Sequence, residues 1–356
     1  MKKTRGDNYR KRLVSDMFGE TDRKLSQLSL LQTISQEELD LSLEGWDIES
    51  APIQTVMLAS FIMKNHPELV FPEKYIPRLK GVLTFCRFQY LKLVSHVTRV
   101  MKTLEQQQIM ALVIKGGAMK AYRPDFPRWM SDIDIVVAEK DYQKAFNLIK
   151  HLGYKPLHRP HSIDMRIPGT EDGVIDIHRY IKTGTGDTTA LNEVLFSRAK
   201  PCRMFSSECL VPCREDMVFI SLVNYFSNIL FKASPENMAT VFLDIMHLVN
   251  TEDGFDWEIV KEDARKTGSV ERLYIIGNLS DDIAPGVLPA RFLEEDANMD
   301  VVSALYRRID YNRNVLAPLR KQIVTPNIMK SIKTYRPLWK YFWLRCKLFF
   351  LKRRKI

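Results

Sequence analysis

The sequence predicts an α/β fold, with a small mixed β-sheet as its core and helical segments before and after that core. Short stretches rich in Ile and Val, at residues 111–114, 131–137 and 173–180, have the length and the β-branched side chains of strands. Longer stretches on either side carry apolar residues at three- and four-residue spacing, which is typical of amphipathic helices.

Residues 25–106 are mainly helical in pattern. The helical spacing is clearest at 53–63 and at 82–104. Between these two stretches we expect a connection, because Pro67, Pro72 and Pro77 interrupt regular structure there. This N-terminal segment is expected to pack against the sheet.

The first predicted strand, residues 111–114, ends at Lys115-Gly116-Gly117. We interpret this as a buried strand that enters a glycine turn and then a helix. Glycines allow the backbone to approach a phosphate closely, and the first amides of the following helix supply hydrogen-bond donors. Most such turns only reverse the chain, so a phosphate site and a plain turn both remain open.

Asp132 and Asp134 flank Ile133 in the second predicted strand. Successive strand residues point to opposite faces, so the two carboxylates would share one face while Ile133 and Ile135 enter the core. Two adjacent carboxylates are costly unless a cation offsets their like charges. Mg²⁺ prefers oxygen ligands and keeps waters open to a substrate phosphate. The pair therefore predicts a magnesium site.

A third carboxylate lies in the strand predicted around Ile175-Asp176-Ile177-His178. Alternation places Asp176 and His178 on one face. Aspartate is depleted in strands, so its position between two isoleucines favours a functional role over a solvated one. If this strand pairs beside the Asp132 strand, Asp176 completes a three-carboxylate cluster. For His178, contact with substrate, orientation of Asp176 and a merely hydrogen-bonded strand end remain open.

The region after the core begins with a predicted β-hairpin at 200–212, followed by amphipathic helices. We expect these helices at 216–231, 237–249 and 257–266, with Pro235 opening the second. Asp244 and His247 lie on neighbouring turns of that helix, and we interpret them as buried or capping residues rather than catalytic ones.

These residues resemble the uncharacterised nucleotidyltransferase family of the DNA polymerase β superfamily. The match covers about residues 105–182. The resemblance depends on an apolar strand leading into Lys115-Gly116-Gly117, Arg128 shortly before Asp132-Ile133-Asp134, Gly153-Tyr154 at a helix end, His161, and Ile175-Asp176-Ile177-His178. One departure is the fourteen residues between Gly117 and Asp132, more than is usual in the superfamily. The intervening segment, around residues 122–129, is expected to form a longer loop over the site.

The resemblance implies a polymerase-β-like nucleotidyltransferase core that transfers a nucleoside monophosphate from an NTP to a hydroxyl-bearing acceptor. It implies two Mg²⁺ or Mn²⁺ ions, with Asp132 and Asp134 as ligands to both and Asp176 as ligand to the ion that activates the acceptor. Lys115 and Arg128 are candidates for neutralising phosphate charge, although each is equally consistent with a solvated base. The predicted nucleotide-binding set is Lys115, Gly116, Gly117, Arg128, Ser131 and His178.

Length and composition predict several regions in one chain. With 356 residues and 45% hydrophobic content, the chain exceeds one typical domain. The sequence shows no apolar signal segment and no uncharged apolar run of eighteen residues, so we expect a cytoplasmic protein without a membrane span. The predicted regions are a helical one at 1–104, the nucleotidyltransferase core at 105–200, a helical one at 201–329 and a basic aromatic tail at 330–356.

The five cysteines do not suggest a disulfide framework, so we expect reduced thiols. A zinc site made by Cys202, Cys209 and Cys213 with a distant histidine is an alternative. The hairpin pattern of residues 200–212 disfavours it.

The excess positive charge lies in the tail. Residues 330–356 contain ten Lys or Arg and no acidic residue, and the rest of the chain has 43 bases and 43 acids. Aromatic residues alternate with these bases, a composition that suits an anionic membrane surface or stacking on nucleic acid. A helix packed on the protein with its cations in solvent is the third interpretation.

Two functions from different classes remain. The first is a metal-dependent nucleotidyltransferase acting on a small-molecule, saccharide or protein acceptor. A nucleic-acid acceptor is less favoured, because the body of the chain has no net charge. The second is a catalytically inactive nucleotidyltransferase fold that binds a membrane surface, as a peripheral protein, or a partner through residues 330–356. Three clustered acids favour the enzyme, since an inactive site has no need of them.

Overall fold

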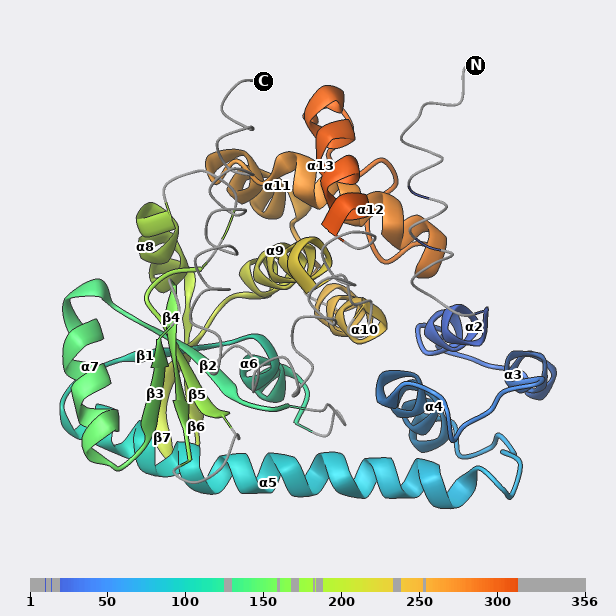
Figure 1. Cartoon of the computed structure of the whole chain (residues 1–356), viewed down its shortest axis with the longest axis horizontal. Helices are drawn as coiled ribbons and strands as arrows, with labels where there is room; N and C mark the ends of the chain where they lie inside the picture. The colour runs from blue at the N-terminus through green and yellow to red at the C-terminus, as the bar shows by residue number, and fades with distance from the viewer. Residues whose placement is uncertain are drawn as a thin grey trace, which may run out of the picture.

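The computed structural model describes residues 10, 14, 20–124, 130–158, 161–167, 173–181, 183, 188–232, 238–251 and 254–312. Arg128 and the predicted tail at 330–356 lie outside these residues. Within them, a mixed sheet with helices on both sides lies at the left of Figure 1, and further helices gather above it and at the opposite end of the molecule.

The sheet has seven strands in the order β3-β4-β5-β2-β1-β7-β6. The strand pairs β1/β2, β3/β4, β4/β5 and β6/β7 are antiparallel, while β2/β5 and β1/β7 are parallel, so the predicted mixed α/β core is confirmed. The strands are β1 (Ala111–Ile114), β2 (Ile133–Val137), β3 (Lys155–His158), β4 (Ser162–Arg166), β5 (Gly173–His178), β6 (Lys200–Met204) and β7 (Ser207–Val211).

The predicted hairpin at 200–212 is confirmed as β6 and β7, which extend the sheet past residue 200. Phe205 and Ser206, between the two strands, both have φ in the left-handed region, at 53° and 59°. Two consecutive positive φ angles match the right-handed twist of a hairpin. All four described cysteines are free, and within the described residues no cysteine belongs to a group that could hold a metal ion.

Helix α5 (Ile76–Gln106) runs along the bottom of Figure 1 and links the sheet to the N-terminal helices. Its second half packs in the same core as the sheet, and its first half packs with the N-terminal helices. The helix begins six residues before the predicted start. The assignment of Pro77 to a connection was therefore wrong, because Pro77 lies in the first turn, where no intrahelical N–H is needed.

The N-terminal helices have a hydrophobic core of their own, separate from that of the sheet. They are α2 (Glu20–Leu28), α3 (Gln36–Leu43) and α4 (Ile53–Asn65). Ser35 caps α3 in a capping box with Glu38, which fixes the start of that helix. The tyrosine hydroxyl of Tyr75 donates a hydrogen bond to the Trp46 carbonyl and closes this core around the start of α5.

Helices α6 (Lys115–Tyr122) and α7 (Glu139–His151) lie on opposite sides of the sheet (Figure 1), and α8 (Thr188–Arg198) precedes the hairpin. The C-terminal helices are α9 (Arg214–Lys232), α10 (Met238–Val249), α11 (Trp257–Lys266), α12 (Val270–Ile283) and α13 (Met299–Tyr311). The three helices predicted in this region correspond to α9, α10 and α11.

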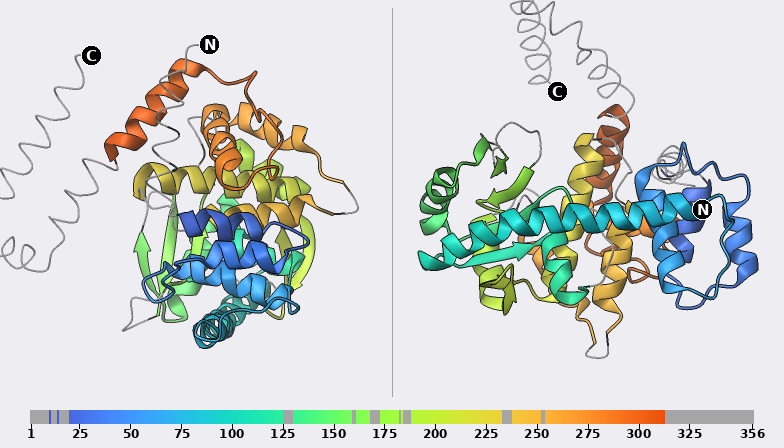
Figure 2. Two further views of the ribbon diagram at one scale, coloured as in Figure 1. Left: turned by 90° about the vertical axis from the view of Figure 1, so that its right-hand side faces the viewer. Right: turned by 90° about the horizontal axis from the view of Figure 1, so that it is seen from below.

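The C-terminal helices share one continuous core with the sheet. Arg198 at the end of α8 forms ion pairs of 2.5 Å with Asp216 on α9 and Asp263 on α11. One guanidinium therefore joins three helices beside the sheet. The views in Figure 2 place these helices in one body with the sheet and α5.

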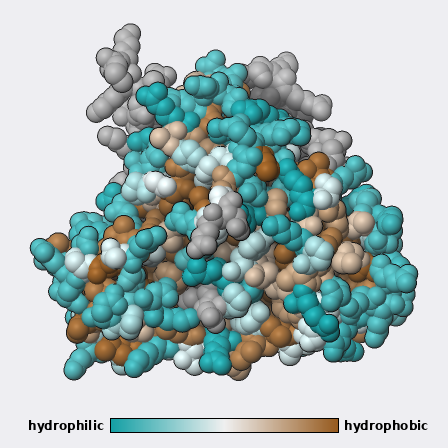
Figure 3. Space-filling model, turned by 180° about the vertical axis from the view of Figure 1, so that it is seen from behind, coloured by the Kyte–Doolittle hydropathy of each residue, from teal (hydrophilic) through white to brown (hydrophobic). Residues whose placement is uncertain are grey.

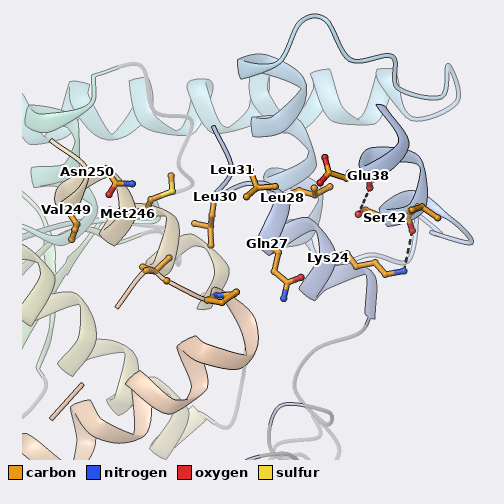
Figure 4. A pocket seen from close by; sticks show the side chains of 14 residues that line it. Lys24, Gln27, Leu28, Leu30, Leu31, Glu38, Ser42, Met246, Val249 and Asn250 are labelled. Atoms are coloured by element: carbon orange, nitrogen blue, oxygen red, sulfur yellow. Dashed lines mark hydrogen bonds between the residues drawn. The ribbon is translucent and has the colours of Figure 1, made fainter. Parts of the chain in front are cut away.

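Among the described residues, no helix is long and apolar enough to cross a membrane. The face shown in Figure 3 is mostly hydrophilic, with hydrophobic side chains scattered among the polar ones. A pocket of about 520 Å³ lies between α2, α3 and α10 (Figure 4). Apolar side chains such as Leu28, Leu30 and Met246 line this pocket, and none of the predicted site residues does.

Candidate active site

Three aspartates stand in register across three neighbouring strands. Asp134 on β2 is the register partner of Asp176 on β5, and Asp176 is in turn the partner of Asp164 on β4. Register partners place their side chains on the same face of a sheet. All three side chains are buried. The sequence pattern of an acid between two apolar residues thus builds a row of carboxylates on one face.

His178 joins this row from the next position of the same face on β5. Its Nε2 atom lies 2.8 Å from Asp134 Oδ1 and 3.4 Å from Asp176 Oδ2. Ligand atoms of Asp134, Asp176 and His178 lie within 4.8 Å of one another. Among the described residues, the buried Asp176 Oδ1 and His178 Nδ1 have no hydrogen-bond partner. Buried polar atoms of this kind normally have a ligand, water or ion as partner.

The donor set of this group suits a divalent cation. Carboxylate oxygens are hard ligands for such ions, and an imidazole nitrogen adds a donor that several first-row metals accept. The like charges of Asp134 and Asp176 gain most from a cation between them. The group therefore fits the metal that the sequence predicted, with His178 as an unexpected member of it.

Asp132 lies just before β2 and outside that tight group. Its Cβ atom is 3.7 Å from the position that a Cβ on Gly173 would take, so Asp132 lies beside the start of β5. Burial, and next the charge of Asp134, raise the pKa of Asp132 to about 6, against the opposing charge of Lys115. Ser131 is exposed and donates a hydrogen bond from its hydroxyl to Asp132 Oδ1.

Lys115 reaches the group from the first residue of α6. Its Nζ lies 2.5 Å from Asp134 Oδ1 and 3.4 Å from His178 Nε2. Burial lowers the pKa of Lys115, but the charge of Asp134 and the hydrogen bond to it, with the charges of Asp132 and Asp176, raise it above the usual lysine value. Burial also raises the pKa of Asp134, but Lys115 and His178 together hold it well below its usual range.

Gly116 and Gly117 are buried in the first turn of α6, so the predicted separate glycine turn is absent from this junction. A Cβ at Gly117 would lie 2.8 Å from Val113 Cγ1 and 3.2 Å from Ile133 Cγ2. The absence of a side chain at Gly117 therefore lets α6 pack closely on β1 and β2. The left-handed residue of the junction is Lys115, with φ of 52°.

Asp164 is the site residue that the sequence interpretation missed. It is buried on β4, and Arg166 Nε donates a hydrogen bond of 3.0 Å to its Oδ2. The signal was present, because Ile163-Asp164-Met165 repeats the apolar–acid–apolar pattern of β2 and β5. His161, one residue before β4, places its ring centroid 5.6 Å from that of His178.

A family model described as an uncharacterised nucleotidyltransferase matches residues 55–284. This match runs from α4 to the end of α12. It contains every strand of the sheet and the four aspartates of the site, Asp132, Asp134, Asp164 and Asp176. No curated protein matches the chain.

Two solved structures are similar to parts of the chain. The solution structure of the antibiotic-resistance factor ANT(2'')-Ia has 10% sequence identity and a TM-score of 0.30, and the similarity covers 65% of this chain and 98% of that one. The crystal structure of an antigenic nucleotidyltransferase-like protein from Paracoccidioides brasiliensis has 12% identity and a TM-score of 0.31, over 51% of this chain and 91% of that one.

Proposed function

The chain belongs to the uncharacterised nucleotidyltransferase family, and from this membership we propose that it transfers a nucleoside monophosphate from an NTP to a hydroxyl-bearing acceptor. The observation that carries the proposal is the buried alignment of Asp134 and Asp176 on paired strands, with His178 in contact with both. Such a cluster of like charges is costly unless cations offset it, and Lys115 supplies a single positive charge beside Asp132, Asp134 and Asp176.

In this proposal Asp132, Asp134 and Asp176 hold two Mg²⁺ or Mn²⁺ ions. When bound, such ions lower the pKa of an acceptor hydroxyl and neutralise charge that develops on the phosphates. Asp176 is the base that takes the proton of the acceptor hydroxyl. His178 fixes the carboxylate of Asp134 by hydrogen bonding, as outer partners do in metal sites, or serves as a ligand itself; its Nε2 lies 3.4 Å from Asp176 Oδ2.

The phosphate-binding role is assigned to the start of α6. Lys115 supplies a point charge to the phosphates, and the amides of Gly116 and Gly117 belong to the first turn of a helix, where anions are stabilised. Ser131, Arg128 and His178 complete the proposed nucleotide-binding set. The acceptor is a small molecule, a saccharide or a protein, and binding of an anionic surface by residues 330–356 is a separate proposal from the sequence alone.

The test is a panel of the four labelled NTPs with Mg²⁺ or Mn²⁺, scored for self-labelling and for transfer of label into a cell extract. We expect label transfer from at least one NTP. We expect Asp134→Asn and Asp176→Asn to lower it by at least about a hundredfold, the scale of losing preorganised charge stabilisation. Asp40→Asn, which removes an exposed carboxylate on α3, should leave transfer unchanged. Equal transfer by both site variants and by the wild type would rule out the proposed mechanism.

A further inference from the structure

Lys115 has an unusual backbone position for a residue that enters a helix. Its φ of 52° lies in the left-handed region, which a non-glycine residue occupies at a cost of about 1 kcal/mol. Strained backbone of this kind persists where the surrounding structure enforces it, and it is common at binding sites. Here it accompanies a side chain that reaches from α6 to β2 and β5.

The ammonium of Lys115 contacts the same atoms that would hold a divalent cation. It lies 2.5 Å from Asp134 Oδ1 and 3.4 Å from His178 Nε2, and both residues belong to the group that could hold a metal ion. A divalent ion bound to Asp134 Oδ1 would stand only a few ångströms from this ammonium. Two cations at that separation in a poorly solvated site repel each other strongly.

We propose that Lys115 is an exchangeable counter-ion that competes with the first divalent cation for Asp134 and moves to the nucleotide phosphates when the cation binds. This inference depends on the proposed function. The side chain is 21% exposed and has a flexible four-carbon stem, so its ammonium has room to leave Asp134 while the backbone keeps its place. Lys115 thereby offsets part of the repulsion among Asp132, Asp134 and Asp176 before the cation arrives.

A neutral residue at position 115 should change the affinities for the divalent cation and for the NTP in opposite directions. Removal of the ammonium frees Asp134, so a divalent cation should bind more tightly. The same removal takes a positive charge from the phosphates, so an NTP should bind more weakly. A lysine whose ammonium binds only phosphate and does not occupy Asp134 would leave cation affinity unchanged.

The experiment measures binding of Mn²⁺ alone to the full chain by calorimetry, without nucleotide. We expect Lys115→Met to lower the Kd for Mn²⁺ by about tenfold, equivalent to about 1.4 kcal/mol. In EDTA the variant should melt at a lower temperature than the wild type, because Asp134 loses its counter-ion, and Mn²⁺ should raise its melting temperature by more.

Lys120→Met is the matched control. Lys120 is also partly buried on α6, but its ammonium contacts the Pro124 carbonyl and lies over the Tyr90 ring. Its Kd for Mn²⁺ should equal that of the wild type. Lys115→Gln, which removes the charge but keeps a hydrogen-bond donor, serves as a second neutral variant if the methionine variant does not fold.

The outcomes separate this inference from the proposed function. If Asp134→Asn abolishes Mn²⁺ binding while Lys115→Met and Lys115→Gln bind Mn²⁺ no more tightly than the wild type, Lys115 does not compete and the proposed function is unaffected. If the wild type binds no Mn²⁺ and none of the variants does, both the inference and the proposed metal site are wrong.

Discussion

Gly117 controls how closely α6 approaches the sheet, because a Cβ there would lie 2.8 Å from Val113 and 3.2 Å from Ile133. We therefore expect Gly117→Ala to lower the free energy of unfolding by about 1 to 3 kcal/mol, the usual cost of overpacking a core. Urea denaturation measures this change. A variant as stable as the wild type would show that the helix is free to shift, and the packing role of Gly117 would be wrong.

Gly81 provides the opposite case for the same substitution. It is exposed in the second turn of α5, and no atom lies within 4 Å of the position that its Cβ would take. Gly81→Ala should raise the free energy of unfolding by about 0.5 to 1 kcal/mol, because alanine costs less backbone entropy than glycine in a helix. Together, Gly117→Ala and Gly81→Ala separate the effect of core packing on the free energy of unfolding from the effect of helix propensity.

At the residue scale, the alternation of apolar and polar residues pointed to Asp134 and Asp176, but the pairing of β2 with β5 that places them on one face came from the structure. Alternation was not enough to place Asp132, because the strand begins one residue later, at Ile133. The partnership of Lys115 with Asp134 was also out of reach, since it depends on how α6 leaves β1. Only the tertiary structure specifies that junction.

At the scale of elements, the strands with β-branched residues and the helices with one apolar face were predictable. Helix α12 was not, because its buried residues occupy most of its surface and leave only a narrow polar face, at Glu271, Asn278 and Asp282, to reveal the period. Strands β3 and β4 were also missed. β3 is short, largely exposed and contains Pro156, which is unfavourable inside a strand.

The contact between α4 and α10 should depend on pH through His247. Its ring packs edge-on against Phe61, and burial, followed by the charge of Arg123, lowers its pKa to about 4 from 6.5. The unfolded chain then binds the proton more readily than the folded one. The contribution of neutral His247 to the free energy of unfolding is complete above pH 6.5 and is lost as the pH falls towards 4.

Between pH 7.5 and pH 5, we expect the free energy of unfolding of the wild type to fall by about 1 kcal/mol more than that of His247→Gln. The difference is smaller than the full shift in the His247 pKa implies, because the side chain is partly exposed to solvent. Denaturant unfolding at both pH values measures the difference. Equal losses in the two proteins would show that His247 titrates alike in the folded and unfolded chains.

At the scale of the whole molecule, one long helix connects two hydrophobic cores (Figure 1). The family match begins at residue 55, so it excludes α2 and α3, which complete the N-terminal core. The sequence indicated helical segments on both sides of the sheet. It did not indicate that the C-terminal helices share the core of the sheet, because that packing joins residues far apart in the chain.

The proposed reaction transfers a nucleoside monophosphate to the acceptor and releases pyrophosphate. The most direct measurement compares NTP labelled at the α-phosphate with the same NTP labelled at the γ-phosphate, using purified protein, Mn²⁺ and cell extract. We expect the α label to enter the acceptor, the γ label to appear only in pyrophosphate, and Asp134→Asn to abolish both signals. Transfer of the γ label to the acceptor, or α-label transfer unchanged in Asp134→Asn, would contradict the proposed reaction.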